Sequence, residues 1–281
     1  MRIISFGDIE IEYLFKNDLF IGYQLGGVAF NTLVNLNDYF SCCYYYNGNL
    51  ENNNFPIEMI KINDQTNKKI FRINNEYTNI CPYCNRQNKF IRKRINSVDI
   101  KDDDILIIDN LRIDTTSITH KLSNQIHLII KYVSLIEEYS LDDLYYLLNN
   151  RFKSIIITKN VYNYIKNKFK IDYDDLFQNA NPDILIIFNG SNGSIIETKD
   201  NIYEKENEFV ITEVNNYGGL ESFYASFIRQ FLEIKDIDEK SISYAYIQGM
   251  INYSKTVMQI GAIPLINKID NYYGCICDKF I

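Results

Sequence analysis

Short runs of consecutive apolar residues recur at wide intervals along the chain. The runs are rich in isoleucine and leucine and span Arg2–Phe6, Ile105–Ile108, His127–Lys131, Ser154–Thr158 and Asp183–Phe188. Apolar residues at nearly every position, rather than at alternate positions, are typical of strands that are covered on both faces. We therefore expect these runs to form a buried sheet.

Segments with a helical spacing of apolar residues separate or follow several of these runs. They span Val28–Asn37, Leu141–Asn149, Val161–Phe169, Ser222–Leu232 and Ser241–Gln259. Strands that alternate with helices indicate a mostly parallel sheet with helices on both faces. The pattern thus predicts an α/β fold of three layers.

Two other segments alternate apolar and polar residues, which is the pattern of strands with one face in water. One covers residues 9–25 and contains Ile-Glu-Ile-Glu-Tyr, and the other covers residues 68–96 around a turn at Cys81-Pro82-Tyr83-Cys84. Both are expected to form a small antiparallel β lid. Because no internal repeat or low-complexity linker divides the chain, residues 1–281 are expected to form a single domain with this lid.

Composition and charge exclude several classes of protein. The 281 residues are 46% hydrophobic and 23% charged, which is a globular composition. A formal net charge of −7 argues against binding to nucleic acid through phosphate contacts. No apolar run approaches the roughly 18 residues that span a bilayer, and the N-terminal sequence turns acidic too early for a signal peptide. We expect a cytoplasmic protein without nucleic acid or membrane as a partner.

The cysteines raise the question of a metal site. Cys81 and Cys84 have the spacing of half a zinc knuckle, and Cys275 and Cys277 could supply the other ligands of the roughly four that structural zinc needs. Because the chain has no second Cys-x-x-Cys, a hairpin turn with incidental reduced cysteines is the favoured alternative. Structural zinc is the alternative hypothesis, and it is the one that makes a specific prediction about these four cysteines.

Three segments place glycine where a backbone could approach a ligand. They are Gly26-Gly27 before a predicted helix, Asn189-Gly190 with Gly193 after a predicted strand, and Gly218-Gly219-Leu220-Glu221 at the start of a late helix. Glycine adopts positive φ readily, and a helix start offers unpaired N–H donors with a partial positive charge. The third segment is therefore a plausible anion site, although each segment alone is more often an ordinary turn.

The order of these segments resembles that of the PfkB family of ribokinase-like carbohydrate kinases over nearly the whole chain. The resemblance rests on Gly7-Asp8 at a strand end, Gly26-Gly27-x-x-x-Asn31, the turn with Gly190 and Gly193, and the glycine-rich helix start at Gly218. It implies a ribokinase-like sandwich with a β lid, and transfer of the γ-phosphate of ATP, with Mg²⁺, to a hydroxyl of a small-molecule sugar or nucleoside. It also implies a homodimer formed through the lid.

The resemblance also implies roles for single residues. Substrate binding would fall to Asp8, Glu12, Gly26, Gly27 and Asn31, nucleotide binding to Asn160, Asn189, Gly190 and Gly193, the anion hole to Gly218, Gly219 and Leu220, and the general base to Glu221. Carboxylates suit polyols because each accepts several hydrogen bonds, and a base beside the acceptor hydroxyl takes its proton during transfer. Glu12 could instead belong to a solvated strand face, and Asn31 could be a surface residue of an Asn-rich chain.

The sequence departs from the family pattern at the catalytic end. Asn215 and Glu221 replace aspartates, Leu220 replaces a glycine, and Asn163 replaces the glutamate of the Asn-x-x-Glu motif that begins at Asn160. A Cβ at Leu220 restricts the loop, and a neutral amide is a poorer partner for Mg²⁺ than a carboxylate. Two hypotheses follow: a kinase, which we favour, and a non-catalytic sugar- or nucleoside-binding pseudokinase with a regulatory or structural role. A hydrolase or other transferase is a weaker third, because we find no nucleophile.

Overall fold

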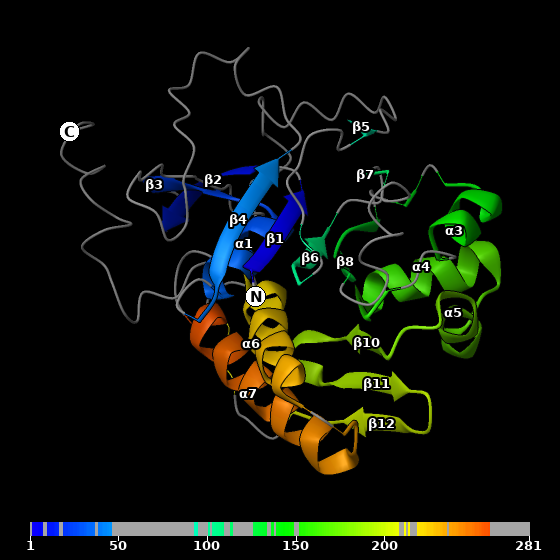
Figure 1. The fold of residues 1–281 in the computed structure, drawn as a ribbon. Helices are drawn as coiled ribbons and strands as arrows, with labels where there is room; N and C mark the ends of the chain where they lie inside the picture. Colours follow the sequence, from blue (N-terminus) through cyan, green and yellow to red (C-terminus); the bar gives the residue numbers. More distant parts are fainter. Residues whose placement is uncertain are drawn as a thin grey trace.

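A computed structural model gives the arrangement of the chain (Figure 1). The structure describes residues 2–7, 10–16, 19–36, 39–46, 93–94, 101, 103–109, 113–114, 126–133, 136–137, 139–148, 152–207, 211, 213, 218–234 and 236–258. Within these, it describes only the backbone of residues 7, 10–16, 19–26, 41–46, 93–94, 113–114 and 146–147.

An eight-stranded sheet lies at the centre, in the order β12-β11-β10-β9-β8-β6-β1-β4. Its strands are β1 (Arg2–Gly7), β4 (Ser41–Tyr46), β6 (Ile105–Ile108), β8 (Ile126–Ile130), β9 (Ser154–Thr158), β10 (Ile184–Phe188), β11 (Ser194–Thr198) and β12 (Ile202–Lys205). Neighbouring strands from β4 to β10 run parallel, and β11 and β12 pair in the antiparallel direction. Every residue of β6, β8 and β10 is buried, which confirms that the apolar runs are strands covered on both faces.

Helices cover both faces of the sheet. One face carries α1 (Val28–Leu36), α6 (Gly219–Glu233) and α7 (Glu239–Val257), and the other carries α3 (Leu141–Leu148), α4 (Lys159–Phe169) and α5 (Tyr173–Ala180). Alternate strand residues point to opposite faces, so that Ile105 and Ile107 join one core whereas Leu106 and Ile108 join the other. The predicted mostly parallel α/β sandwich is confirmed.

The first segment expected to form a lid is an antiparallel pair of strands. It consists of β2 (Glu10–Lys16) and β3 (Leu19–Gly26), which form a separate two-stranded sheet. Of the second segment the structure describes only β5 (Lys93–Arg94), which pairs in parallel with β7 (Ile113–Asp114). The remainder of residues 68–96 lies outside the described residues. The single domain with a closing lid therefore stays a prediction.

Glycine allows α6 and α7 to pack closely. A Cβ added at Gly249 of α7 would lie 2.7 Å from the ring of Phe223 on α6, which is fully buried. The Phe223 ring also packs at a tilt against Phe188 at the end of β10, with 4.6 Å between ring centroids, and makes an edge contact with Tyr246 on α7, with 5.8 Å between centroids. The two helices are thus fixed to each other and to the end of β10. No helix among the described residues is long and apolar enough to cross a bilayer.

A buried chain of polar side chains lies under α6. The Nδ1 atom of His127 on β8 lies 2.7 Å from the Ser154 hydroxyl on β9, which in turn lies 2.5 Å from the Tyr224 hydroxyl on α6. All three side chains are fully buried. Burial, with a smaller contribution from Lys153, lowers the pKa of His127 from 6.5 to about 3, because a charged imidazolium would lose its hydration.

Replacement of Gly249 by alanine is expected to lower the free energy of unfolding by about 1–3 kcal/mol, because the Phe223 ring must move within a packed core. Urea unfolding measures the change. Gln248→Ala, at a half-exposed neighbour on the same helix, is the control and should change stability little. Equal stability of the two variants would contradict the close packing.

His127 should make the protein acid-labile. The pKa of His127 is lower in the folded chain than in the unfolded chain. The neutral histidine therefore contributes fully to the free energy of unfolding above about pH 6.5. This contribution is lost as the pH falls toward 3, because the unfolded chain then binds a proton that the folded chain does not. On acidification, we expect the free energy of unfolding of the wild-type protein to fall by up to about 1.4 kcal/mol more per pH unit than that of His127→Gln. Urea unfolding from pH 7 to pH 5 measures both slopes, and equal slopes would argue against a neutral buried histidine.

Candidate active site

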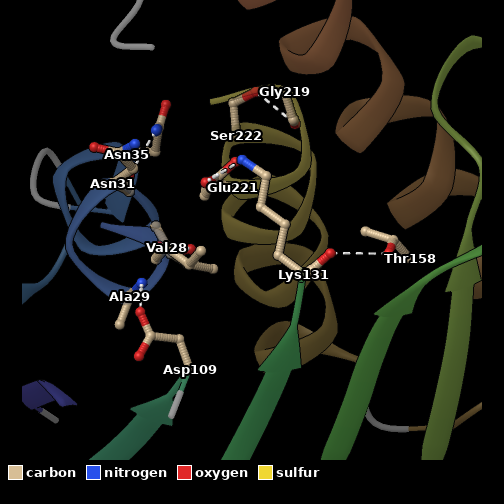
Figure 2. A network of polar contacts seen from close by, with 11 residues as sticks. Val28, Ala29, Asn31, Asn35, Asp109, Lys131, Thr158, Gly219, Glu221 and Ser222 are labelled. Atoms are coloured by element: carbon tan, nitrogen blue, oxygen red, sulfur yellow. Dashed lines mark hydrogen bonds and ion pairs between the residues drawn. The ribbon is translucent and has the colours of Figure 1, made fainter. Parts of the chain in front are cut away.

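The parallel strands bring several polar residues to one edge of the sheet. Asp109, Lys131 and Asn189 directly follow β6, β8 and β10, and Thr158 is the last residue of β9. In open α/β sheets, ligands bind outside the carboxyl ends of the strands. Figure 2 shows that the starts of α1 and α6 lie at this same edge, on either side of the Lys131 side chain.

An ion pair between Lys131 and Glu221 crosses this edge. The Nζ atom of Lys131 donates to Oε1 of Glu221 over 2.9 Å (Figure 2). The side chain of Glu221 is fully buried and that of Lys131 is 13% exposed. The carboxylate predicted as the general base therefore lies at the carboxyl edge of the sheet, where it is paired with an ammonium group that was not predicted.

Thr158 fixes the backbone of Lys131. Its hydroxyl donates to the Lys131 carbonyl over 3.0 Å and accepts from the Val161 amide over 3.3 Å, so that it is also the N-cap of α4. One side chain thus joins the end of β8 to the start of α4. The backbone at the base of the lysine side chain is thus held, and the four-carbon stem beyond it has several rotatable bonds.

The start of α1 is held by a carboxylate from β6. Asp109 Oδ2 accepts from the Ala29 amide over 2.7 Å, which stabilises the helix terminus as an N-cap does (Figure 2). Gly27 has φ +126° immediately before the helix, a conformation that favours glycine. Asn31 is fully buried, so the interpretation as a surface residue is wrong. Its contact with a substrate stays a prediction.

The glycine-rich start of α6 combines an anion-site geometry with a packing role. Gly218 is the N-cap of α6, has φ +67° and has no side chain that could accept a hydrogen bond from the first amides of the helix. A Cβ at Gly219 would lie 2.7 Å from the Tyr253 ring, so this glycine is required by the contact with α7. Leu220 is 3% exposed and its side chain belongs to the apolar core.

The turn after β10 also lies against α7. Gly190 and Gly193 have φ +60° and +98°, and a Cβ at Gly193 would collide with the Lys205 carbonyl at 2.2 Å. Asn189 is exposed before this turn. Tyr253 on α7 lies close to Gly190 and donates to Glu213 Oε1 over 2.5 Å, and burial together with this carboxylate raises the pKa of the tyrosine hydroxyl. The turn is therefore next to the start of α6.

The remaining predicted residues divide into two groups. Asn160 and Asn163 are exposed in the first turns of α4, which begins at the same edge of the sheet. Gly26 ends β3, and the backbone of Glu12 pairs with Gln24, but the Glu12 side chain is not described. Asp8, Asn215, Cys81, Cys84, Cys275 and Cys277 lie outside the described residues. The zinc hypothesis therefore stays untested, and the described part of the chain has no group of three or more potential metal ligands.

Solved structures share this architecture. A nucleoside kinase from Methanocaldococcus jannaschii, an archaeal member of the ribokinase family, has a TM-score of 0.63 at 16% identity and covers 93% of each chain. A Vibrio cholerae fructokinase with bound fructose, ADP and calcium has a TM-score of 0.62 at 10% identity, with 93% of this chain and 94% of that chain covered. A Salmonella enterica aminoimidazole riboside kinase, bound to its riboside and an ATP analog, has a TM-score of 0.61 at 10% identity, with 94% and 95% covered.

These likenesses confirm the ribokinase-like fold that the resemblance implied. No protein-family model matches the sequence, and no curated protein matches it significantly. At these low identities the structural comparison establishes the fold, while function must be argued from the site.

Sequence reasoning missed Lys131, Thr158 and Asp109 as members of this site. Each one ends or directly follows an apolar run, and that position was the available signal, because parallel strands place such residues at the ligand-binding edge. Lys131 was assigned to the end of a strand, and its reach to α6 depends on a contact between residues 90 positions apart.

Replacement of Thr158 by valine should lower the free energy of unfolding by about 1–2 kcal/mol, since it removes the N-cap of α4 and the partner of the Lys131 carbonyl. Thr158→Ser keeps the hydroxyl and serves as the matched control. Thermal or urea unfolding of both variants checks this, and a valine variant as stable as the serine variant would show that the hydroxyl has no such role.

Proposed function

We propose that the chain is an ATP-dependent kinase that transfers a phosphoryl group to a hydroxyl of a small sugar or nucleoside. The observation that carries this proposal is the buried carboxylate of Glu221 in the first turn of α6, next to the helix start at Gly218 and at the carboxyl edge of the sheet. The fold shared with sugar and nucleoside kinases supports it.

The residues of this edge fit a phosphate-bearing ligand. Amides at a helix start bind anions, and the positive φ of Gly218 turns the backbone into that start without a side chain in the way. ATP with Mg²⁺ would supply the phosphoryl group. Mg²⁺ is usually held through one or two carboxylates together with substrate phosphates, so it does not require a cage of protein ligands.

Glu221 would accept the proton of the acceptor hydroxyl, and the amides of Gly219–Glu221 would bind the phosphoryl oxygens. Asn31 and Gly27 at the start of α1 would contact the acceptor, together with Asp8, Glu12 and Gly26. The turn at Asn189, Gly190 and Gly193, with Asn160 on α4, would face the nucleotide. We further propose that β2 and β3 form the lid, that the protein acts in the cytoplasm, and that two copies associate through the lid.

One observation favours a second candidate function, that of a non-catalytic protein which binds a sugar or nucleoside. The ammonium group of Lys131 lies 2.9 Å from Glu221 and occupies an oxygen of the carboxylate that would have to accept the proton of the acceptor hydroxyl. An ion pair that persists with ligands bound would leave binding intact and make phosphoryl transfer slow.

A phosphotransfer assay with ATP, Mg²⁺ and a panel of sugars and nucleosides tests the kinase. We expect turnover with at least one acceptor, and a fall in kcat of about a hundredfold or more in Glu221→Gln, because the amide cannot accept the proton. Glu204→Gln, at an exposed position on β12, is the control and should retain activity.

Absence of turnover with every acceptor, together with a thermal shift caused by one of them, would favour the binding protein. Restored or increased turnover in Glu221→Asp would count against it, because a shorter carboxylate can still act as a base.

A further inference from the structure

Lys131 has features that a simple structural ion pair does not require. Its ammonium group lies at the carboxyl edge of the sheet, between the starts of α1 and α6 (Figure 2), and its side chain keeps 13% of its surface exposed. Glu221, its partner, is fully buried. A ligand that enters this edge can therefore contact the lysine directly, and it must pass the lysine to reach the carboxylate.

The energetics also favour a role beyond stability. A buried ion pair costs the hydration of both charges, and replacement of such a pair by apolar residues is often neutral or stabilising. Leu220, the neighbour of Glu221, lies in an apolar core, so apolar residues are accommodated at this end of α6. A cation beside the positive end of a helix dipole instead forms a site that is complementary to an anion.

The attachment of Lys131 permits its ammonium group to change partners. The Thr158 hydroxyl holds the lysine carbonyl at 3.0 Å, so the backbone stays in place while the flexible stem turns. In contrast, Glu221 is fixed within the first turn of α6. A rotation of the lysine stem would bring the ammonium group from the carboxylate toward a ligand without moving a helix.

We propose that Lys131 is the cation of the phosphoryl-transfer site and that it moves from Glu221 to the transferred phosphoryl group, an inference that rests on the proposed kinase function. In this step the acceptor oxygen forms a bond to the γ-phosphorus of ATP, the bond from that phosphorus to the bridging oxygen breaks, and ADP keeps the electron pair. The acceptor proton goes to the Glu221 carboxylate, which the departure of the ammonium has freed. The ammonium group of Lys131 then contacts the phosphoryl oxygens, where negative charge is concentrated.

The test compares variants in a background without the buried carboxylate. Glu221→Gln keeps Lys131 and gives it a neutral amide oxygen as acceptor, and Glu221→Gln combined with Lys131→Met removes both charges, so neither variant leaves a fully buried carboxylate without its counter-charge. Isothermal titration with ADP and with a non-hydrolysable ATP analogue, both with Mg²⁺, gives the preference of each variant for the third phosphate. This readout does not depend on turnover.

We expect Glu221→Gln to prefer the ATP analogue about tenfold or more strongly than the double variant does, with ADP affinity nearly unchanged, because a hydrogen bond from a charged donor to phosphate is lost. Lys131→Arg should keep most of the preference. Lys153→Met removes an ion pair with Asp183 at the opposite ends of β9 and β10, and as the matched control it should keep the wild-type preference.

An unchanged preference in the double variant, while wild type binds nucleotide and transfers phosphate, would overturn the role of Lys131 and leave the kinase in place. Failure of wild type to bind either nucleotide would overturn the kinase and this inference with it. A loss of preference that Lys153→Met reproduces would also overturn the inference, since the effect would then come from a general loss of positive charge.

Discussion

The shared direction of the central strands is the constraint on which the rest of this molecule depends. Because β1, β6, β8, β9 and β10 run parallel, every chain segment that leaves them does so at one edge. The helices α1 and α6 also begin there, so the amides of their first turns and the polar residues after the strands share a small region. The parallel direction of the strands therefore determines where the site lies and which chain segments contribute to it.

Much of the fold could be predicted because the apolar pattern directly reports burial. The runs at Ile105–Ile108 and Ser154–Thr158 coincide with β6 and β9, and the late helices were placed to within a few residues. The helix α5 was missed, although Asp172 and Asp175 form a capping box at its start, which is a signal that sequence reasoning can use. Its short length leaves little periodicity to detect.

The site could be predicted only in part. Glycines with positive φ, such as Gly190 and Gly218, leave a mark in the sequence because few other residues adopt that conformation. The sequence does not show the second reason for glycine in this site, which is close packing: Gly219 leaves room for the Tyr253 ring of another helix. The ion pair of Glu221 was equally invisible, because a lysine that follows a strand gives no indication of which carboxylate it will meet.

The double attachment of Lys131 has a mechanical consequence. Its carbonyl is bonded through Thr158 to the start of α4, which covers one face of the sheet, whereas its ammonium reaches α6, which covers the other. These two helices belong to layers that lie on opposite faces of the sheet. Lys131 therefore connects the two layers across the sheet, so that a displacement of α4 can reach the carboxylate of Glu221 through the backbone and side chain of this one residue.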